Sequence, residues 1–437
     1  MLKIVSGLLN NVFKTKDIRV LVKNFMSLSV LQAVNSLLPL ITMPYLLRVL
    51  APESFGVIAI AQAIMQYLTN LTDYGFNLTA TKELSINKQN KEKVSEIFNS
   101  VMVIKFVLML LSFLILCVLV ASIEDYRSEA LVYFLSFGMV LGNVLFQTWF
   151  FQGMEKMFYI TVINIISKLF FTVLVFFLIK DNGDYLYYPL LLSLGFVISG
   201  IISLFIVYRD FKIVFRFPSF SSLKYYAKEG WYVFISTFML SLYTNSTVII
   251  LGIVTSEIYA GYYSAAEKII SAIYRLFLPI QQAVYPYVSR LANDSKRQSV
   301  NFIRKLTAFV GGISFVISLG IFLFSSIIVD RFCGPQYQSS VIVFRILSFI
   351  IFVKALGNVF GIQTMLAYDF KKAYMNIIVS AFVLHVTLSL LLGLALNHIG
   401  VSISVMIAET YIVISSLIFL QYKGIKIISF SKEKVSG

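Results

Sequence analysis

Residues 97–122 read IFNSVMVIKFVLMLLSFLILCVLVAS, and Lys105 is the one charged residue among them. A helix needs about 20 apolar residues to cross a hydrocarbon core of about 30 Å, so this stretch is long enough to span a membrane. Of the 437 residues, 59% are hydrophobic and only 13% are charged, whereas soluble domains carry about 25% charged residues. Similar apolar stretches recur along the whole chain. The sequence therefore predicts an all-α, polytopic membrane protein.

The apolar stretches predict about twelve membrane-spanning helices. Their approximate limits are 24–49, 54–80, 97–122, 129–151, 158–179, 186–208, 230–254, 257–289, 303–329, 338–365, 373–397 and 399–421. Only the loops near 81–96, 209–229 and 290–302 have any length. They leave no room for a catalytic domain outside the membrane.

The net charge of +15 is spread over short clusters between the apolar stretches. No face or tail collects it, which argues against a nucleic-acid partner. If the N-terminus is cytoplasmic, 26 loop bases lie on the cytoplasmic side and four, Arg48, Arg127, Lys180 and Arg331, lie on the other. The positive-inside rule then predicts an even number of spans with both termini in the cytoplasm.

We expect the chain to be organised as two bundles of six helices around a central cavity. Residues 1–22 mix apolar and basic residues without a small-residue cleavage site, so they predict an amphipathic segment on the cytoplasmic surface, not a cleaved signal. The predicted parts are this segment at 1–22, a bundle at 23–208, a cytoplasmic linker at 209–229, a second bundle at 230–422 and a basic cytoplasmic tail at 423–437. Cys117 and Cys333 have neither metal-site nor disulfide spacing.

A weak internal repeat supports the two bundles. Residues 50–61 read LAPESFGVIAIA, and residues 255–266, at an offset of 205, read TSEIYAGYYSAA. Each has a small loop, an acidic residue and a glycine inside the next helix. Transporters with such duplications commonly work by alternating access, in which one bundle rocks against the other.

Six bases lie inside predicted spans and away from their ends. A charge there costs a few kcal/mol even on lenient scales, so it usually faces a partner or a watery cavity. The six are Lys105, Lys168, Lys268, Arg275, Arg345 and Lys354.

The span at 257–289 carries a polar stripe. Ser264, Lys268, Ser271 and Arg275 follow helical spacing and are predicted to share one face. Such a face suits an anion better than lipid. The alternative is that Lys268 is neutralised by Glu267 or by a partner helix, although side chains one residue apart point about 100° apart.

Three acidic residues in or near predicted spans are candidates for coupling to protons or sodium ions: Asp73, Glu267 and Glu409. A carboxyl group in a low dielectric environment titrates at a raised pKa, which suits ion coupling. The alternative for each is a structural partnership with a buried base. We predict no cofactor, no metal site and no catalytic residue.

Prolines and amides mark further candidate positions. Proline removes a backbone hydrogen bond and permits a bend where a gate can form; the candidates are Pro39, Pro44, Pro279 and Pro286. Gln32, Asn35 and Asn245 are candidates to bind sugar or phosphate from the cavity wall. Hydrogen bonding between helices is the alternative role.

Four stretches resemble recurrent signatures of the polysaccharide transporters, or O-antigen flippases. This family belongs to the superfamily of multidrug antiporters and the lipid II flippase. The stretches are PYLLRVLAPESFG at 44–56, DYGFNLTATKE at 73–83, WFFQGMEKM at 149–157 and GYYSAAEKI at 261–269. They occur in the family's order over the first two-thirds of the chain. Beyond about residue 300 the resemblance rests on hydropathy.

The resemblance implies that the chain flips an undecaprenyl-diphosphate-linked oligosaccharide from the cytoplasmic to the periplasmic leaflet of the bacterial inner membrane. Charge-assisted hydrogen bonds from cavity cations would offset the desolvation of the diphosphate. Arg48 matches the first signature and would receive the head group at the periplasmic mouth. Twelve spans, where the lipid II flippase has fourteen, argue against lipid II as the cargo.

Four other functions are alternatives to this prediction. A multidrug exporter would favour carboxylates in its cavity, whereas bases outnumber acids here. An enzyme would need a large extramembrane loop or a D-x-D site, and an ATP-driven pump would need G-x-x-x-x-G-K-[ST], which is absent. A non-transporting assembly scaffold stays open. We expect a functional monomer that acts with membrane lipid, an O-antigen polymerase and a chain-length regulator.

Overall fold

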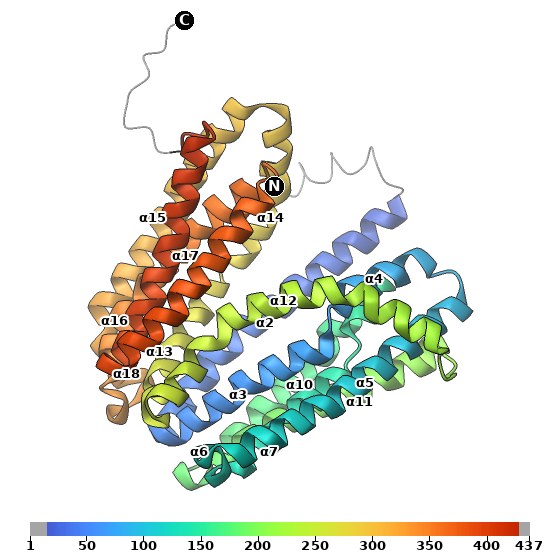
Figure 1. Ribbon diagram of the computed structural model, residues 1–437, viewed down its shortest axis with the longest axis horizontal. Coiled ribbons are helices and arrows are strands. Elements are labelled where there is room, and N and C mark those ends of the chain that lie inside the picture. The colour runs from blue at the N-terminus through green and yellow to red at the C-terminus, as the bar shows by residue number, and fades with distance from the viewer. Residues whose placement is uncertain (1–14, 428–437) are drawn as a thin grey trace, which may run out of the picture. The chain divides into compact units, whose positions relative to one another are not determined.

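The computed structural model describes residues 15–427, and every regular element among them is a helix (Figure 1). The predicted surface segment at 1–22 lies mostly outside the described residues; its last part, from Thr15, forms the first turns of α2 instead of a separate helix. The predicted tail at 423–437 is described only to residue 427.

The helices follow one another with short connections. The first half of the chain contains α2 (Thr15–Val49), α3 (Pro52–Asp73), α4 (Phe76–Asn87), α5 (Lys91–Ser122), α6 (Glu124–Ser128), α7 (Ala130–Ser136), α8 (Gly138–Leu145), α9 (Thr148–Gly153), α10 (Met157–Leu178), η1 (Asn182–Leu186) and α11 (Tyr187–Phe211). The second half contains α12 (Phe220–Val254), α13 (Glu257–Arg275), α14 (Leu278–Asp294), α15 (Lys296–Ile328), η2 (Val329–Cys333), η3 (Pro335–Tyr337), α16 (Ser340–Ser348), α17 (Ile350–Gly357), η4 (Asn358–Leu366) and α18 (Lys371–Tyr422).

Each of the twelve predicted spans coincides with helical residues. Within residues 15–427, nine helices are long and apolar enough to cross a membrane, or ten if the two arms of α12, bent by 45°, count as one span. The rest of the difference from twelve has two local causes. Helix α18 contains both of the last two predicted spans, joined through Asn397 at φ 50°, and the span predicted at 257–289 is broken between α13 and α14.

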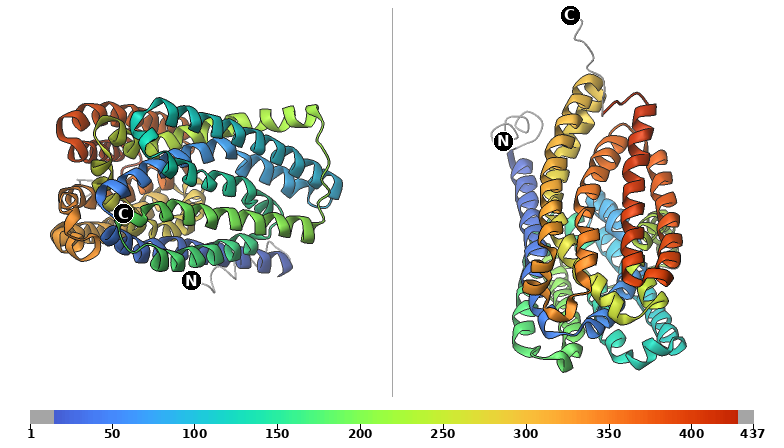
Figure 2. Two further views of the ribbon diagram at one scale, coloured as in Figure 1. Left: turned by 90° about the horizontal axis from the view of Figure 1, so that it is seen from below. Right: turned by 90° about the vertical axis from the view of Figure 1, so that its left-hand side faces the viewer.

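Contacts within the chain divide it into two compact units that are not its two continuous halves. Unit 1 contains the chain up to Leu38 together with Val57–Ser246, and unit 2 contains Pro39–Gly56 together with the chain from Thr247 onward. Helices α2, α3 and α12 therefore each contribute to both units. Within unit 2, α15 to α18 run side by side (Figure 2, right). The division into bundles at 23–208 and 230–422 stays a prediction.

The exposed side chains of the long helices are largely apolar, as a lipid-facing surface requires. On α5, Leu114 and Val118 are exposed, whereas Ser112 and Leu116 are buried. Small hydroxyl residues let neighbouring helices approach closely and bond across their interface; the buried Ser203 hydroxyl, for example, accepts a hydrogen bond from the Gln147 backbone N–H at 2.9 Å.

In unit 1, the second and third signature stretches pack against each other. The Thr81 hydroxyl on α4 donates to the Trp149 carbonyl at the start of α9 at 3.0 Å. The Trp149 indole N–H is satisfied by the Gln147 side chain at 2.9 Å. Trp149, Phe150 and Phe151 are fully buried and form the aromatic core of this unit. Two stretches that lie about 70 residues apart therefore form one structural feature.

In unit 2, the first and fourth signature stretches pack against each other with backbone touching backbone. A Cβ atom added to Gly56 would lie 1.8 Å from the Glu257 carbonyl oxygen, and one added to Gly261 would lie 1.9 Å from the Pro52 carbonyl oxygen. Each glycine therefore faces the residue four positions before the other glycine. The contact is reciprocal at the offset of 205 residues seen in the sequence, which supports the internal repeat.

Candidate functional site

In unit 1, Lys105 is bound into a buried polar cluster. Its ammonium lies 3.1 Å from the Asp73 carboxylate, which also accepts a hydrogen bond from the Asn143 amide at 2.9 Å. Lys105 is only 1% exposed. Asp73 is the last residue of α3, so its carboxylate lies next to the partial negative charge of the helix C-terminus. The positive charge of Lys105 offsets both negative charges. In this conformation Lys105 faces Asp73 and presents no surface to a ligand; its role in binding cargo stays a prediction.

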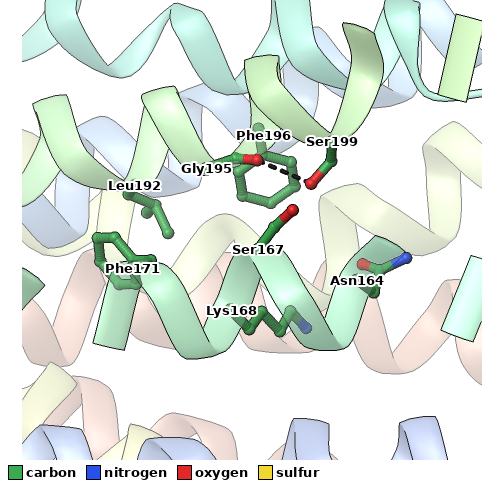
Figure 3. A pocket seen from close by; sticks show the side chains of 8 residues that line it. All are labelled: Asn164, Ser167, Lys168, Phe171, Leu192, Gly195, Phe196 and Ser199. Atoms are coloured by element: carbon green, nitrogen blue, oxygen red, sulfur yellow. Dashed lines mark hydrogen bonds between the residues drawn. The ribbon is translucent and has the colours of Figure 1, made fainter. Parts of the chain in front are cut away.

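Lys168 lies on α10, where its ammonium donates to the Asn35 side chain of α2. It lines a small cavity between α10 and α11 (Figure 3) with a volume of about 50 Å³. In Figure 3 the Ser199 hydroxyl donates to the Gly195 carbonyl at 2.7 Å. The buried Ser167 hydroxyl has no hydrogen-bond partner among the described residues. A cavity of this size holds one or two water molecules and no sugar.

The other amide candidates of unit 1 bond locally. The Asn245 amide donates to the Ser241 carbonyl at 3.1 Å within α12, and Asn70 of α3 donates to the Ser241 hydroxyl. Gln32 is half-buried on α2, and its backbone carbonyl accepts a hydrogen bond from Ser36 at 3.0 Å. The Asn70–Ser241 bond joins two helices, as the alternative role for such residues requires.

In unit 2, the Lys268 ammonium lies over the Phe55 ring, 5.2 Å from its centroid. This cation–π contact joins the first and fourth signature stretches. Glu267 instead accepts a hydrogen bond from the Ser271 hydroxyl at 2.6 Å on the same helix. Ser264 is buried, and its hydroxyl has no hydrogen-bond partner among the described residues. Lys268 is thus held at a well-defined place on α13.

Arg275 is exposed and ends α13. A base in the last turn of a helix is stabilised by the helix dipole, which gives Arg275 a structural role whether or not it binds cargo. Arg48 likewise lies exposed in the last turn of α2 and donates to the Arg331 carbonyl. Both Arg48 and Arg331 were assigned to the periplasmic side by charge, and both lie together in unit 2.

The remaining intramembrane charges of unit 2 have partners. Lys354 lies 3.5 Å from the Glu409 carboxylate, and the Arg345 guanidinium donates to the Ser325 hydroxyl at 3.1 Å. Asp73 and Glu409 are therefore both seen as partners of buried bases, the structural role weighed above. Coupling through Asp73, Glu267 or Glu409 stays a prediction.

Of the four candidate gate prolines, Pro279 lies beside a break between helices and the other three lie within helices. Helix α2 continues through Pro39 and Pro44, and Pro39 is the residue at which α2 passes from unit 1 to unit 2. Pro279 lies in the first turn of α14, just after the break that follows α13, and Pro286 lies within α14. Gating at these positions stays a prediction.

Two partners in these sites, Asn143 and Phe55, were not predicted from the sequence, nor were the hydrogen bonds of His385. Asn143 is uncharged, and Phe55 is an ordinary apolar residue in a span, so neither gave a signal. The buried His385 imidazole lies within hydrogen-bond distance of Thr247, Ser389 and Ser404, at 3.1, 3.2 and 3.3 Å. Only its presence in a predicted span distinguished His385.

Within unit 2, helix α13 supplies two bases, Lys268 and Arg275, with the Ser264 and Ser271 hydroxyl groups on the same helix. Such an arrangement can hold an anion through charge-assisted hydrogen bonds. Among the described residues there is no group of three or more His, Cys, Asp or Glu side chains that could hold a metal ion.

Comparison with known proteins places this geometry in a family. A sequence profile described as "Polysaccharide biosynthesis protein" matches residues 21–292. The chain is 34% identical over 399 residues to a protein of Escherichia coli (strain K12) named "Putative O-antigen transporter", covering 91% of this chain and 96% of that protein. A protein of Shigella dysenteriae with the same name is 28% identical and covers 73% of this chain and 79% of the relative. The chain belongs to the polysaccharide biosynthesis protein family.

Solved structures show the same fold at low sequence identity. The structure described as "Lipid II flippase MurJ, inward closed conformation" matches with a TM-score of 0.70 and 15% identity, over 90% of this chain and 87% of that one. An inward-facing multidrug resistance MATE family transporter also matches with a TM-score of 0.70 and 15% identity, over 93% and 99%. The predicted family and the predicted fold class, an all-α multi-pass membrane protein, are confirmed.

Proposed function

We propose that this chain is a flippase that moves an undecaprenyl-diphosphate-linked oligosaccharide, such as an O-antigen repeat unit, across the bacterial inner membrane. The direction is from the cytoplasmic to the periplasmic leaflet, with both termini in the cytoplasm. Its relatives are named as transporters, and its fold is shared with a flippase and an exporter. The chain is therefore a transporter and not an enzyme.

The observation that carries this proposal is the excess of bases over acids in the membrane-spanning segments. Away from the ends of the spans there are six bases against three acids. The described ion pairs engage two of those acids with Lys105 and Lys354. A multidrug cation would favour the reverse balance. A diphosphate is the common anionic group of lipid-linked oligosaccharides, and fixed cations lower the cost of moving it out of water.

Lys268 is the cation we assign to the diphosphate. It lies on the fourth signature stretch, and the Phe55 ring of the first stretch holds its ammonium in place. Arg275, two turns further along α13, adds a second positive charge. Alternating access would expose these groups to each leaflet in turn.

Complementation in cells tests this assignment. We expect the chain to restore surface polysaccharide in an O-antigen-producing cell that lacks its own flippase. Lys268→Ala and Arg275→Ala should each lower the restored amount by about tenfold or more, because losing one charge-assisted contact costs about 1.5–3 kcal/mol. Arg297→Ala, which removes an exposed base from the first turn of α15, should restore it fully. Surface polysaccharide is read on a gel, with the amount of each variant in the membrane measured alongside.

The outcomes separate the function from the site. Full restoration by all three variants would keep the transport function and remove Lys268 and Arg275 from the binding site. No restoration by the parent chain, when it is inserted in normal amounts and given matched cargo, would contradict the proposed function.

The proposal also includes a functional monomer that works beside an O-antigen polymerase and a chain-length regulator. Proton or sodium coupling through Asp73, Glu267 or Glu409 is compatible with it. Cross-linking that revealed an obligate dimer sharing one pathway would contradict the monomer.

A further inference from the structure

A second candidate site lies apart from the intramembrane charges, in unit 1. It is a cleft of about 620 Å³ between the first turns of α5 and the irregular segment 212–219 that joins α11 to α12. This volume falls in the range of small-molecule sites, about 300–1,000 Å³. By the positive-inside rule, the loops that form both walls of the cleft are predicted to lie on the cytoplasmic side of the membrane. Nothing in the proposed transport step uses it.

The cleft carries an excess of positive charge. It is lined by four bases and two acids: Lys91, Lys93, Lys212, Arg216, Glu92 and Glu96. Lys93 is bound to Glu96 at 3.0 Å, and the Ser222 hydroxyl also donates to Glu96 at 2.8 Å. None of the ion pairs among the described residues involves the other three bases. The positive end of the α5 helix dipole adds to their field.

The deep wall of the cleft has an acceptor that lacks a donor. Asn99 lines the cleft and is only 2% exposed. Its Nδ2 donates to the Val214 carbonyl at 2.9 Å, which fixes the amide so that Oδ1 is the remaining acceptor. That Oδ1 is buried and has no hydrogen-bond partner among the described residues. A buried acceptor without a donor is costly, so a ligand hydroxyl would stabilise this wall.

The rim of the cleft and the residues beside it are apolar and aromatic; Val214 and Phe217 line the cleft, and Phe215 and Phe220 lie near them in the chain. Val214, Phe215, Phe217 and Phe220 are 55%, 57%, 81% and 81% exposed, and they alternate with or flank the bases of the same segment. Large exposed aromatic residues next to bases are typical of a segment at the membrane–water interface, where the bases meet anionic lipid headgroups.

We propose that this cleft binds the headgroup of an anionic phospholipid that carries hydroxyl groups beside its phosphate, as phosphatidylglycerol does. Lys91, Lys212 and Arg216 hold the phosphate. Asn99 Oδ1 accepts a hydrogen bond from a headgroup hydroxyl. The exposed phenylalanines of the rim lie among the acyl chains of the same leaflet.

Native mass spectrometry of the full chain in detergent tests this, with phosphatidylglycerol or phosphatidylcholine added at equal concentration. We expect more phosphatidylglycerol to be retained. The double variant Lys212→Gln/Arg216→Gln should lose that preference, because each base near anionic lipid contributes roughly fivefold in affinity. The matched double variant Lys156→Gln/Arg297→Gln removes the same charge from exposed positions outside the cleft and should keep the preference.

Asn99→Leu tests the hydroxyl contact. It should lower the retention of phosphatidylglycerol several-fold and leave that of phosphatidic acid, which has no headgroup hydroxyl beyond its phosphate, unchanged. If Asn99→Leu fails to fold, the two charge variants still decide the proposal.

Three outcomes would overturn the proposal: equal retention of phosphatidylglycerol and phosphatidylcholine, an equal loss in both double variants, or full displacement of the lipid by equimolar glycerol 1-phosphate. The last would identify a site for a soluble phosphate ester instead.

Discussion

Gly261→Val should abolish accumulation of folded protein, and Gly261→Ala should lower the free energy of unfolding by about 3 kcal/mol or more. A Cβ at Gly261 would lie 1.9 Å from the Pro52 carbonyl oxygen, and one at Gly56 would lie 1.8 Å from that of Glu257. Both obstacles are backbone atoms, so no side chain can rotate away, and overpacking of this kind usually costs 1–3 kcal/mol and occasionally more. Thermal unfolding of the purified chain in detergent measures the effect.

Helix α15 of the same unit provides matched controls. Gly312 and Gly320 have no neighbouring atom within 4 Å of an added Cβ. Alanine at either position should be neutral or slightly stabilising, because alanine is favoured over glycine in a helix by about 1 kcal/mol. If Gly261→Ala unfolds at the same temperature as Gly312→Ala, the reciprocal contact between the two signature stretches is not as close as described.

Asp73→Leu should destabilise the chain by about 3–5 kcal/mol. Lys105 is only 1% exposed, and the substitution would leave its ammonium buried without a counter-charge. Removing one member of a buried ion pair has a cost of this size. The double variant Asp73→Leu/Lys105→Met should regain most of the lost stability, since an apolar pair of similar volume replaces an ion pair at little cost. Thermal unfolding of the three chains gives the interaction free energy.

The same double variant separates a structural role from coupling. If Asp73 only pairs with Lys105, the folded double variant should still restore surface polysaccharide in cells. A double variant that is stable and inactive would assign transport to the pair itself. An Asp73→Leu chain as stable as the parent would contradict the buried pair.

The membrane-spanning helices could be predicted from the sequence because hydropathy is a local property. The break between the last two spans, predicted near residue 398, falls at Asn397, where the backbone turns to φ 50°. Pro279 predicted a bend in the span at 257–289, but the break lies just before it, after Arg275. Leu276 and Phe277 continue the apolar pattern, so its exact position gave no signal. Length and composition show where a helix can exist, not whether it is continuous.

The packing partners of the helices were harder to predict. The tandem repeat suggests two continuous bundles, which stay a prediction. It gave no sign that Pro39–Gly56 makes its contacts in unit 2 and the first part of α12 in unit 1. Hydropathy does not indicate which other helices a given helix packs against. The glycines of the repeat were the one local signal, because only residues without a side chain allow two backbones to touch.

For the candidate site, the sequence indicated which charges are out of place in lipid but not what they contact. Buried bases stand out by type alone, whereas their partners are ordinary residues. The contacts of Phe55 with Lys268 and of Asn143 with Asp73 are seen only in the folded structure. The balance between a ligand role and a pairing role depends on such partners, so it could not be resolved from spacing.

Transport by purified protein tests the central claim most directly. The chain is reconstituted into liposomes that hold undecaprenyl-diphosphate-linked oligosaccharide in both leaflets, and a glycosidase that cannot cross the membrane is added outside. Empty liposomes should protect the inner leaflet's share of the oligosaccharide. Liposomes with the parent chain should lose that protection, and those with Lys268→Ala should lose it much more slowly. If the folded parent chain leaves protection equal to that of empty liposomes, it does not flip this cargo.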